Sequence, residues 1–138
     1  MQSGGVYAES QPLVHLCGYA DWQQALATGE LRPASLLDAG FVHLSDPEQA
    51  HLPANRLFTG RTDLVALFLD PGRLGAPVRW EPGLASDPPG MLFPHLYGAV
   101  PVPAVIGVRR YLPDAAGRFG PLIHSGGEEM YSGETRDC

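Results

Sequence analysis

Six consecutive apolar residues, Leu64–Leu69, constrain the fold of this chain more than any other segment. A strand that faces solvent on one side alternates apolar and polar residues, whereas a strand covered on both faces is apolar throughout. We therefore expect Leu64–Leu69 to form a central strand, with other parts of the chain packed against both faces of its sheet.

Shorter apolar or alternating segments predict further strands before and after this one. The expected strands are Leu13–Cys17, Phe41–Ser45, Val78–Glu81, Leu92–Tyr97 and Val105–Tyr111. Pro101 and Pro103 exclude the segment between the last two strands from a sheet interior, because proline lacks the N–H that a strand ladder needs.

The first expected helix follows the strand Leu13–Cys17. Asp21 is expected to cap it, and Gly29 is expected to end it. Trp22 and Leu26 are one turn apart in the sequence, so we expect both on the inner face of this helix.

Two shorter helical segments are expected downstream. A turn or short helix over Pro33–Leu37 is expected to close at Gly40. Ser45 or Asp46 is expected to cap the next helix, which Pro53 is expected to break early.

Two or three short helices against five or six strands predict a small single α+β domain with a mixed, bent (split) sheet. The length of 138 residues fits one domain. We expect residues 1–11 to be flexible, residues 12–116 to form the globular domain, and residues 117–138 to form a mobile polar tail. Residues 126–138 contain four acidic residues and one arginine, a composition typical of solvated tails.

The charge composition excludes several classes of partner. The net charge is −6 at pH 7, and all nine basic residues are arginines, none of them in a long basic cluster. Binding to duplex nucleic acid needs such clusters, so it is not expected. Residues 1–12 lack the positive start and apolar core of a signal peptide, so we expect none, and no apolar stretch approaches the roughly 18 residues that would span a bilayer. We expect a cytoplasmic protein without membrane contact, a monomer or weak homodimer that binds a small molecule.

Three histidines, His15, His43 and His95, interrupt segments that otherwise have the apolar pattern of buried strands. A buried imidazole without partners costs on the order of 1–3 kcal/mol. Strand alternation places His15 on one face with Cys17, and His43 on one face with Ser45. We expect the three rings to line one polar cleft. The alternative for each ring is a core histidine bonded to a backbone carbonyl.

A zinc site and a cysteine nucleophile are alternative interpretations of the same residues. Zinc sites usually take two ligands from a close pair such as His-x-x-x-His, whereas intervals of 28 and 52 residues separate these histidines. Cys17 stands in an apolar strand pattern, which favours a small buried side chain over a reactive thiolate. We expect no metal.

Four further side chains are candidates for the same site. Glu81 ends a strand and is suited to accept hydrogen bonds from a sugar diol or to act as a general base. Arg56 and Arg61 are suited to phosphate, or to the C-terminal end of a helix. Tyr97 offers a ring for stacking on a base or for core packing.

The motifs, in this order, resemble the small bacterial family known as domain of unknown function 952. The specific ones are Gly-Phe-Val-His-Leu-Ser at 40–45, Trp-Glu-Pro at 80–82 and Phe-Pro-His-Leu-Tyr-Gly at 93–98, and the resemblance covers about Leu13–Leu112. That family is similar to the ADP-ribosyltransferase fold, nearest to the RNA 2′-phosphotransferases, in which two histidines contact NAD or ADP-ribose. By position, His15 and His43 match these two. The chain lacks the Arg and one His of the Arg-x-His-x-His run of those enzymes, and it lacks their basic RNA surface.

The resemblance implies an ADP-ribosyltransferase-like transferase or hydrolase whose substrate is NAD or an ADP-ribose-like nucleotide. The implied catalytic residues are His43, Glu81 and His95, and the implied ligand-binding residues are His15, His43, Ser45, Arg56, Arg61 and Tyr97. In this hypothesis the bond to nicotinamide loosens through an oxocarbenium-like transition state that a carboxylate stabilises. The alternatives are a non-catalytic nucleotide- or sugar-binding module and an enzyme acting on a secondary-metabolite intermediate.

Overall fold

The segment Leu64–Leu69 (β4) is the middle strand of a sheet with the order β1-β4-β8, which confirms the prediction from its apolar run. The computed structural model describes residues 11–122. The predicted acidic segment 126–138 and the predicted flexible start up to residue 10 lie outside the described residues.

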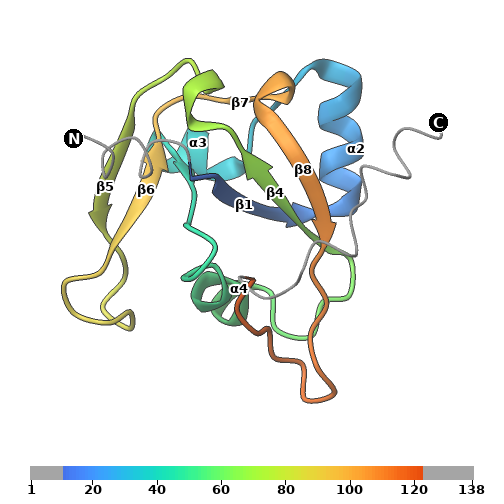
Figure 1. Ribbon diagram of the computed structural model, residues 1–138, viewed down its shortest axis with the longest axis vertical. Coiled ribbons are helices and arrows are strands. Elements are labelled where there is room, and N and C mark those ends of the chain that lie inside the picture. Colours follow the sequence, from blue (N-terminus) through green and yellow to red (C-terminus); the bar gives the residue numbers. More distant parts are fainter. Residues whose placement is uncertain (1–10, 123–138) are drawn as a thin grey trace.

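Figure 1 shows the arrangement of the helices and strands. In chain order they are β1 (Leu13–Gly18), α2 (Tyr19–Thr28), β2 (Glu30–Leu31), α3 (Ala34–Ala39), β3 (Val42–His43), α4 (His51–Leu57), β4 (Leu64–Leu69), the 3₁₀ turn η1 (Pro71–Arg73), β5 (Val78–Pro82), β6 (Leu92–Leu96), β7 (Val100–Pro101), the 3₁₀ turn η2 (Val102–Ala104) and β8 (Val105–Arg110). The described part is therefore a small α+β domain with three α-helices.

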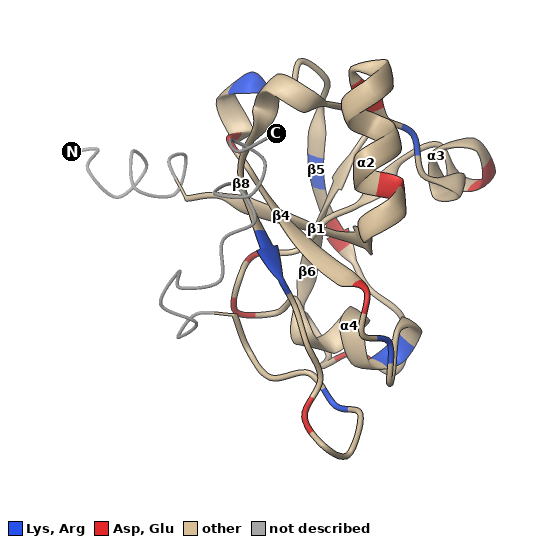
Figure 2. Ribbon diagram, turned by 90° about the vertical axis from the view of Figure 1, so that its right-hand side faces the viewer, with Lys and Arg blue, Asp and Glu red and all other residues tan. Residues whose placement is uncertain are grey.

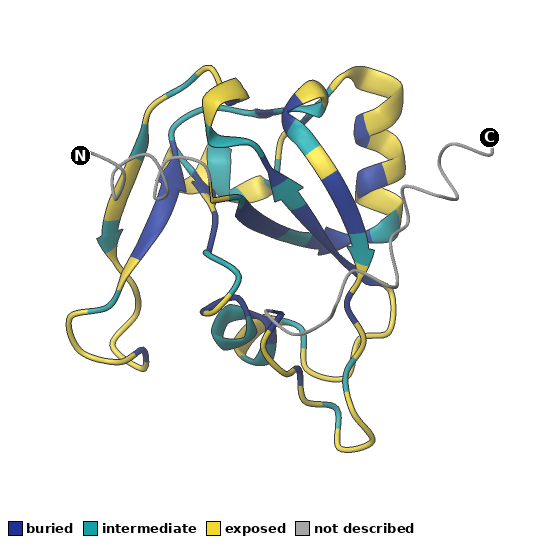
Figure 3. Ribbon diagram, in the orientation of Figure 1, coloured by how far each residue is buried: buried dark blue, intermediate teal, exposed yellow. Residues whose placement is uncertain are grey.

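Strand β4 separates two apolar cores, because its side chains alternate between the two faces of the sheet. Val65, Leu67 and Leu69 belong to the larger core, whereas Leu64 and Ala66 belong to the smaller one. All five are almost inaccessible to solvent, and Figure 3 shows β4 buried along most of its length. The sheet is covered on both faces, as a continuously apolar strand requires.

A second sheet, with the order β3-β6-β5, lies beside β1. Two backbone hydrogen bonds join the sheets: the Val14 N–H donates to the Ser45 oxygen at 2.7 Å, and the Ser45 N–H donates to the Val14 oxygen at 2.8 Å. Within the described residues the two sheets thus meet at this short bridge between β1 and Ser45, which follows β3, and this is the split sheet that the sequence predicted.

Every strand pair in the described residues is antiparallel, so the prediction of a mixed sheet is wrong in this respect. A parallel pair needs a crossover connection that returns the chain to the same end of its sheet. Here α2 leads from β1 to the small β2-β7 pair, and α4 leads from β3 to β4. Each of these helices connects strands of different sheets.

Helix α2 differs from its prediction at its start and on its inner face. It begins at Tyr19 after Gly18, and Asp21 lies inside its first turn without capping it. Trp22 and Ala25 are buried, whereas Leu26 is 43% exposed, so the buried stripe has a spacing of three residues instead of four. The prediction for its end is confirmed: Gly29 closes the helix with a φ of 96°, which only glycine adopts at low cost.

Helix α4 contains Pro53, so the prediction that this proline breaks the helix is wrong. Pro53 is the third helical residue, and N–H groups of the first turn have no partner inside the helix that proline would remove. The turn before the helix is fixed by Asp46 and Gln49. The Gln49 N–H donates to Asp46 Oδ1 at 2.8 Å, and the Asp46 N–H donates to Gln49 Oε1 at 3.1 Å.

The packed part of the chain extends beyond the predicted end of the domain at residue 116. Phe119 and Leu122 are buried in the smaller core. The Phe119 backbone also exchanges two hydrogen bonds with the Asn55 side chain on α4, at 2.7 and 2.9 Å. This segment therefore helps to cover the face of the sheet that carries the smaller core.

Charged side chains are scattered over the described elements, and Figure 2 shows acidic and basic positions interspersed without a continuous basic stripe. Among residues 11–122 no helix has the length and apolar character needed to cross a bilayer.

We expect Leu67→Ala to lower the free energy of unfolding by about 2–5 kcal/mol, because Leu67 is fully buried between β1 and β8 and its truncation leaves a cavity. Ile106→Ala on β8 is the control, since Ile106 is 55% exposed and should cost less than about 1 kcal/mol. Urea unfolding followed by circular dichroism measures both. Equal losses in the two variants would contradict the assignment of β4 as the central strand.

Candidate functional site

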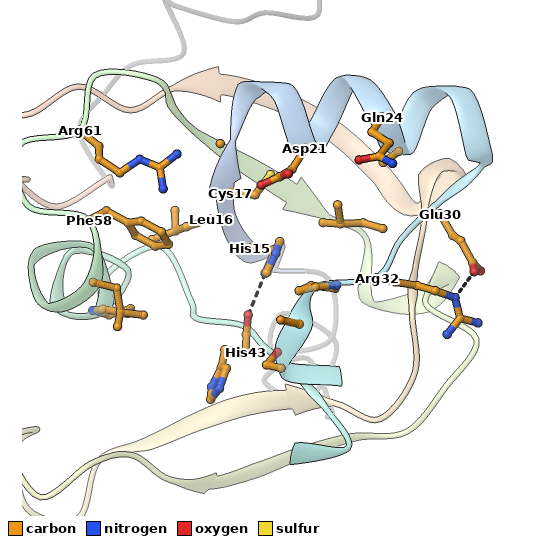
Figure 4. Close-up of a pocket in the computed structure, with 18 of the residues that line it drawn as sticks. His15, Leu16, Cys17, Asp21, Gln24, Glu30, Arg32, His43, Phe58 and Arg61 are labelled. Atoms are coloured by element: carbon orange, nitrogen blue, oxygen red, sulfur yellow. Dashed lines mark hydrogen bonds and ion pairs between the residues drawn. The ribbon is translucent and has the colours of Figure 1, made fainter. Parts of the chain in front are cut away.

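A pocket with a volume of about 780 Å³ opens beside β1, between the start of α2, the β2–α3 segment and the end of α4 (Figure 4). Its lining combines polar, charged and apolar side chains. They include His15, His43, Asp21, Gln24, Glu30, Arg32, Arg61, Leu57 and Phe58. The sequence predicted three of these as ligand-binding residues: His15, His43 and Arg61.

His15 is held in one orientation by a backbone hydrogen bond. The ring belongs to β1 and is only 7% exposed, and its Nδ1 lies 2.9 Å from the carbonyl oxygen of His43. A carbonyl only accepts, so Nδ1 must carry the proton. Burial lowers the pKa of His15, and this effect exceeds the opposing effect of the carbonyl. The ring is therefore neutral near pH 7, and its Nε2 is a hydrogen-bond acceptor.

The acceptor Nε2 of His15 has no hydrogen-bond partner within the described part of the chain. Figure 4 shows that this second nitrogen points away from the His43 carbonyl, toward the region between Cys17 and Asp21. An orphaned acceptor in a pocket is suited to a ligand that brings an O–H or N–H group.

His43 lies on β3 between the pocket and a second group of polar residues. It contributes to the pocket lining, and it is directly opposite His95 in the β3–β6 register. The two rings meet edge to face with their centroids 5.4 Å apart. Burial lowers the pKa of His43, as do the nearby positive charges that His95 and Arg56 carry when protonated. His43 is therefore a second imidazole that is neutral near pH 7.

The second group consists of Glu81, His95 and Tyr97 on β5, β6 and the residue after β6. His95 Nδ1 lies 2.7 Å from Glu81 Oε1, and the Tyr97 hydroxyl donates to the same oxygen at 2.7 Å. These two hydrogen bonds lower the pKa of Glu81, and the Glu81 carboxylate raises the pKa of Tyr97. Phe41 stacks on the His95 ring at a centroid distance of 4.0 Å. None of these four residues lines the pocket itself.

Arg61 lines the pocket close to the end of α4. It forms a two-point ion pair with Asp63, from Nε to Oδ1 at 2.9 Å and from Nη2 to Oδ2 at 2.6 Å, and it lies over the Phe58 ring at 5.4 Å. Its Nη1 has no protein partner in residues 11–122. A Cβ on Gly18 would lie 2.7 Å from Arg61 Nη2, so glycine is what allows the guanidinium to approach β1.

Three predicted ligand-binding residues do not line the pocket: Tyr97, which belongs to the second group, Ser45 and Arg56. Ser45 is buried, and its backbone joins the two sheets. Arg56 pairs with Asp87 at 2.7 Å and so connects α4 to the loop between β5 and β6. Asp87 itself is buried and accepts a hydrogen bond from the Leu84 N–H at 2.8 Å. Sequence patterns did not indicate this role for Asp87, because an acid followed by two prolines is typical of an exposed turn.

Sequence reasoning also missed Phe58, Asp21 and Gln24 as pocket residues. Phe58 carried a signal, since it stands between the two arginines that were considered for phosphate. Asp21 and Gln24 carried none, because a helix start and an exposed helix face account for both.

Cys17 lines the pocket but is a poor nucleophile. It is 7% exposed, and burial raises its pKa to about 12. The thiol therefore stays protonated at neutral pH, as the sequence predicted for a small buried side chain. Within residues 11–122, no three His, Cys, Asp or Glu side chains are grouped so as to hold a metal ion.

Comparisons with known proteins identify relatives without a described activity. A family model described as "Protein of unknown function (DUF952)" matches residues 16–108. The crystal structure of protein CC0527 from Caulobacter crescentus is similar, with a TM-score of 0.68 and 32% sequence identity over 79% of this chain and 93% of that chain. Its solution NMR structure gives a TM-score of 0.64 and 33% identity over 78% of this chain and 90% of that chain. No curated protein matches the chain.

We expect acidification from pH 7 to pH 5 to reduce the free energy of unfolding, in part through His15. Its pKa is lowered below 6.5 in the folded state, so the unfolded chain takes up the proton first as the pH falls. His15→Asn keeps an N–H donor for the His43 carbonyl but removes the titrating group, so its stability should fall less over this range. Urea unfolding at several pH values measures the difference. An equal fall in wild type and variant would contradict a neutral His15.

Proposed function

The chain belongs to the DUF952 family, and we propose that it binds a nucleotide of the NAD or ADP-ribose type in the pocket around His15. The nucleotide would be the substrate of a glycosyl or ADP-ribosyl transfer to a small molecule or to water. The observation that carries the proposal is the neutral His15 ring, whose Nδ1–H is committed to the His43 carbonyl and whose Nε2 has no partner.

The acceptor on His15 favours a sugar over a phosphate at that point of the pocket. A hydroxyl of ribose can donate to Nε2, whereas a phosphate oxygen at neutral pH has no proton to donate and would meet the nitrogen lone pair. Because the ring is fixed by the backbone of another strand, little side-chain entropy is lost when the ligand binds.

Other features of the pocket fit the rest of such a nucleotide. Arg61 keeps Nη1 available for a diphosphate oxygen, and guanidinium groups suit phosphate. Leu57 and Phe58 supply apolar and aromatic surface for a flat ring. A volume of about 780 Å³ lies within the roughly 300–1,000 Å³ usual for sites of small molecules and cofactors.

The split antiparallel sheet adds support at the level of the fold. The resemblance to the ADP-ribosyltransferase fold implies a ligand-contacting histidine on the first strand and another after a glycine-containing turn. His15 lies on β1 and His43 follows Gly40, and the backbone bonds between the two strands place both beside one pocket.

For the reaction, we propose that the bond between nicotinamide and ribose loosens while positive charge develops on the sugar. His43 would contact the ribose, and the ionised Glu81 and the His95 ring would act from the far side of His43. Ser45 and Arg56 were expected to bind the nucleotide. In this proposal they would only stabilise the fold, Ser45 through its backbone bonds to Val14 and Arg56 through its ion pair with Asp87.

A non-catalytic nucleotide-binding module is the second candidate. It is favoured by the fact that Glu81, His95 and Tyr97 do not line the pocket. Binding would then need only His15, His43 and Arg61, and the three outer residues would stabilise the second sheet.

We expect ADP-ribose to bind the wild-type protein in isothermal titration calorimetry, and His15→Asn to weaken binding about 5- to 100-fold, because a buried ligand hydroxyl loses its acceptor. Arg61→Gln should weaken ADP-ribose more than it weakens ribose. Arg73→Gln is the control, since Arg73 is an exposed partner of Asp70 on η1. Equal affinity in wild type and His15→Asn, or no binding of ADP-ribose and NAD at millimolar concentration, would refute the proposed pocket.

Release of nicotinamide from NAD, followed by chromatography, separates the two candidate functions. Release by the wild type supports the enzyme. ADP-ribose binding without any release supports the binding module.

A further inference from the structure

Asp21 carries the one charge in the pocket lining that no ion pair compensates among the described residues. The charged side chains of the lining are Asp21, Glu30, Arg32 and Arg61. Arg32 pairs with Glu30, and Arg61 pairs with Asp63. The Asp21 carboxylate forms no hydrogen bond or ion pair within residues 11–122. Because both imidazoles of the lining are neutral, the uncompensated charge of this pocket is negative.

The Asp21 carboxylate lies at the corner of the pocket where β1 meets α2 (Figure 4). Asp21 is exposed in the first turn of α2, so a ligand can reach it from solvent. A Cβ on Gly18 would lie 3.7 Å from Asp21 Oδ2 and 2.7 Å from Arg61 Nη2, so the two side chains approach the same point of β1. Nε and Nη2 of Arg61 both donate to Asp63, which leaves the Asp21 carboxylate without a bond to the guanidinium.

The second acceptor at this corner is His15 Nε2. The ring is only 7% exposed, and its Nδ1–H is fixed on the His43 carbonyl, so that Nε2 points toward the region between Cys17 and Asp21 (Figure 4). Burial has the largest effect on the pKa of His15, and the negative charge of Asp21 has a smaller, opposing effect, as expected for two neighbouring groups. The corner thus presents an imidazole acceptor and a carboxylate acceptor side by side.

Two neighbouring acceptors match the two donors of a vicinal diol. The 2′- and 3′-hydroxyls of ribose stand on adjacent carbons, so one can donate to the imidazole while the other donates to the carboxylate. In NADP the 2′-phosphate removes one of these donors and adds negative charge, and carboxylates that bind the ribose diol in other dinucleotide sites favour NAD for this reason. At this corner the phosphate would meet the carboxylate of Asp21, and both arginines of the lining are already paired.

The position of His43 indicates which ribose of the nucleotide lies here. The His15 ring faces the His43 carbonyl with Nδ1 and the side of Asp21 with Nε2, so His43 and Asp21 lie on opposite sides of the ring (Figure 4). In the proposed function, His43 contacts the ribose that loses nicotinamide. The diol beside Asp21 therefore belongs to the other ribose, which carries adenine.

We propose that Asp21 and His15 bind the 2′,3′-diol of the adenosine ribose, and that Asp21 makes the pocket selective for nucleotides without a phosphate on that diol. The inference rests on the proposed function and names its substrate class, which is NAD and ADP-ribose but not their 2′-phosphorylated counterparts. His15 supplies an acceptor alone, whereas Asp21 supplies an acceptor and repels a second phosphate.

Asp21 also stabilises the start of α2, since a negative charge in the first turn interacts favourably with the helix dipole. That role affects folding and is independent of the ligand. The preference between two ligands that differ only in the 2′-phosphate therefore separates selectivity from the structural role.

We expect the wild-type protein to bind ADP-ribose about 10- to 100-fold more tightly than ADP-ribose 2′-phosphate in isothermal titration calorimetry, because the phosphate removes a donor and adds charge beside Asp21. ADP-ribose that lacks the 2′-hydroxyl on its adenosine ribose should have an intermediate affinity, since it loses the hydrogen bond without the repulsion. A wild type that binds all three ligands equally overturns the inference.

Asp21→Asn keeps the size of the side chain and removes its charge. It should weaken ADP-ribose about 3- to 10-fold and strengthen ADP-ribose 2′-phosphate, so that the preference between them falls by about tenfold. A purely structural role would weaken both ligands alike, and steric exclusion of the phosphate would persist in this variant of nearly equal shape. Far-UV circular dichroism verifies that the variant is folded.

Asp38→Asn is the matched control. Asp38 is an exposed acid of α3 outside the pocket lining, so this variant makes the same change in net charge and should keep the wild-type preference. An unchanged preference in Asp21→Asn overturns the inference, and so does an equal loss of preference in Asp38→Asn.

The outcomes also separate this inference from the proposed function. A wild type that binds ADP-ribose without discriminating against the 2′-phosphate overturns the role of Asp21 and leaves the proposed pocket standing. A wild type that binds neither ADP-ribose nor NAD overturns the proposed function, and the inference falls with it.

Discussion

The junction between β1 and β3 is the constraint on which the rest of this molecule depends. Two backbone hydrogen bonds connect Val14 and Ser45, and the side chain of His15 adds a third bond to the His43 carbonyl. These bonds hold the two three-stranded sheets side by side. Without them, the pocket beside β1 would not adjoin His43, whose own sheet places it opposite His95 on β6.

The two imidazoles of the candidate site are neutral near pH 7, because burial lowers the pKa of both His15 and His43. Arg61 is paired with Asp63, and the pocket offers oriented hydrogen-bonding groups beside the carboxyl group of Asp21. Such a lining is selective for the positions of hydroxyl groups, because an unpaired acceptor in a poorly solvated place penalises any ligand that does not supply a donor. The ionised Glu81 lies on the outer side, where two hydrogen bonds stabilise it.

Elements defined by local rules could be predicted, whereas those defined by packing could not. The apolar run of β4 and the left-handed glycines at 29 and 40 were predicted because periodicity and backbone sterics act within a few residues. Burial of Ala25 in place of Leu26 depended on the angle at which α2 meets the core, which no local pattern encodes. The antiparallel pairing and the burial of Phe119 could not be predicted for the same reason, since both depend on contacts between segments far apart in the chain.

For the candidate site, the sequence alone determined that three imidazoles interrupt strands and which face of its strand each one occupies, because side chains alternate along any strand. Only the tertiary structure decided that His15 and His43 share a pocket while His95 lies behind His43, paired with Glu81. It also decided that Arg61 lines the pocket and Arg56 does not, since the Arg56 guanidinium pairs with Asp87. The physical reason is that side chains alternate between the two faces of a strand, so the local sequence determines the face on which a side chain lies. Its neighbours are determined by hydrogen bonds between residues far apart in the chain.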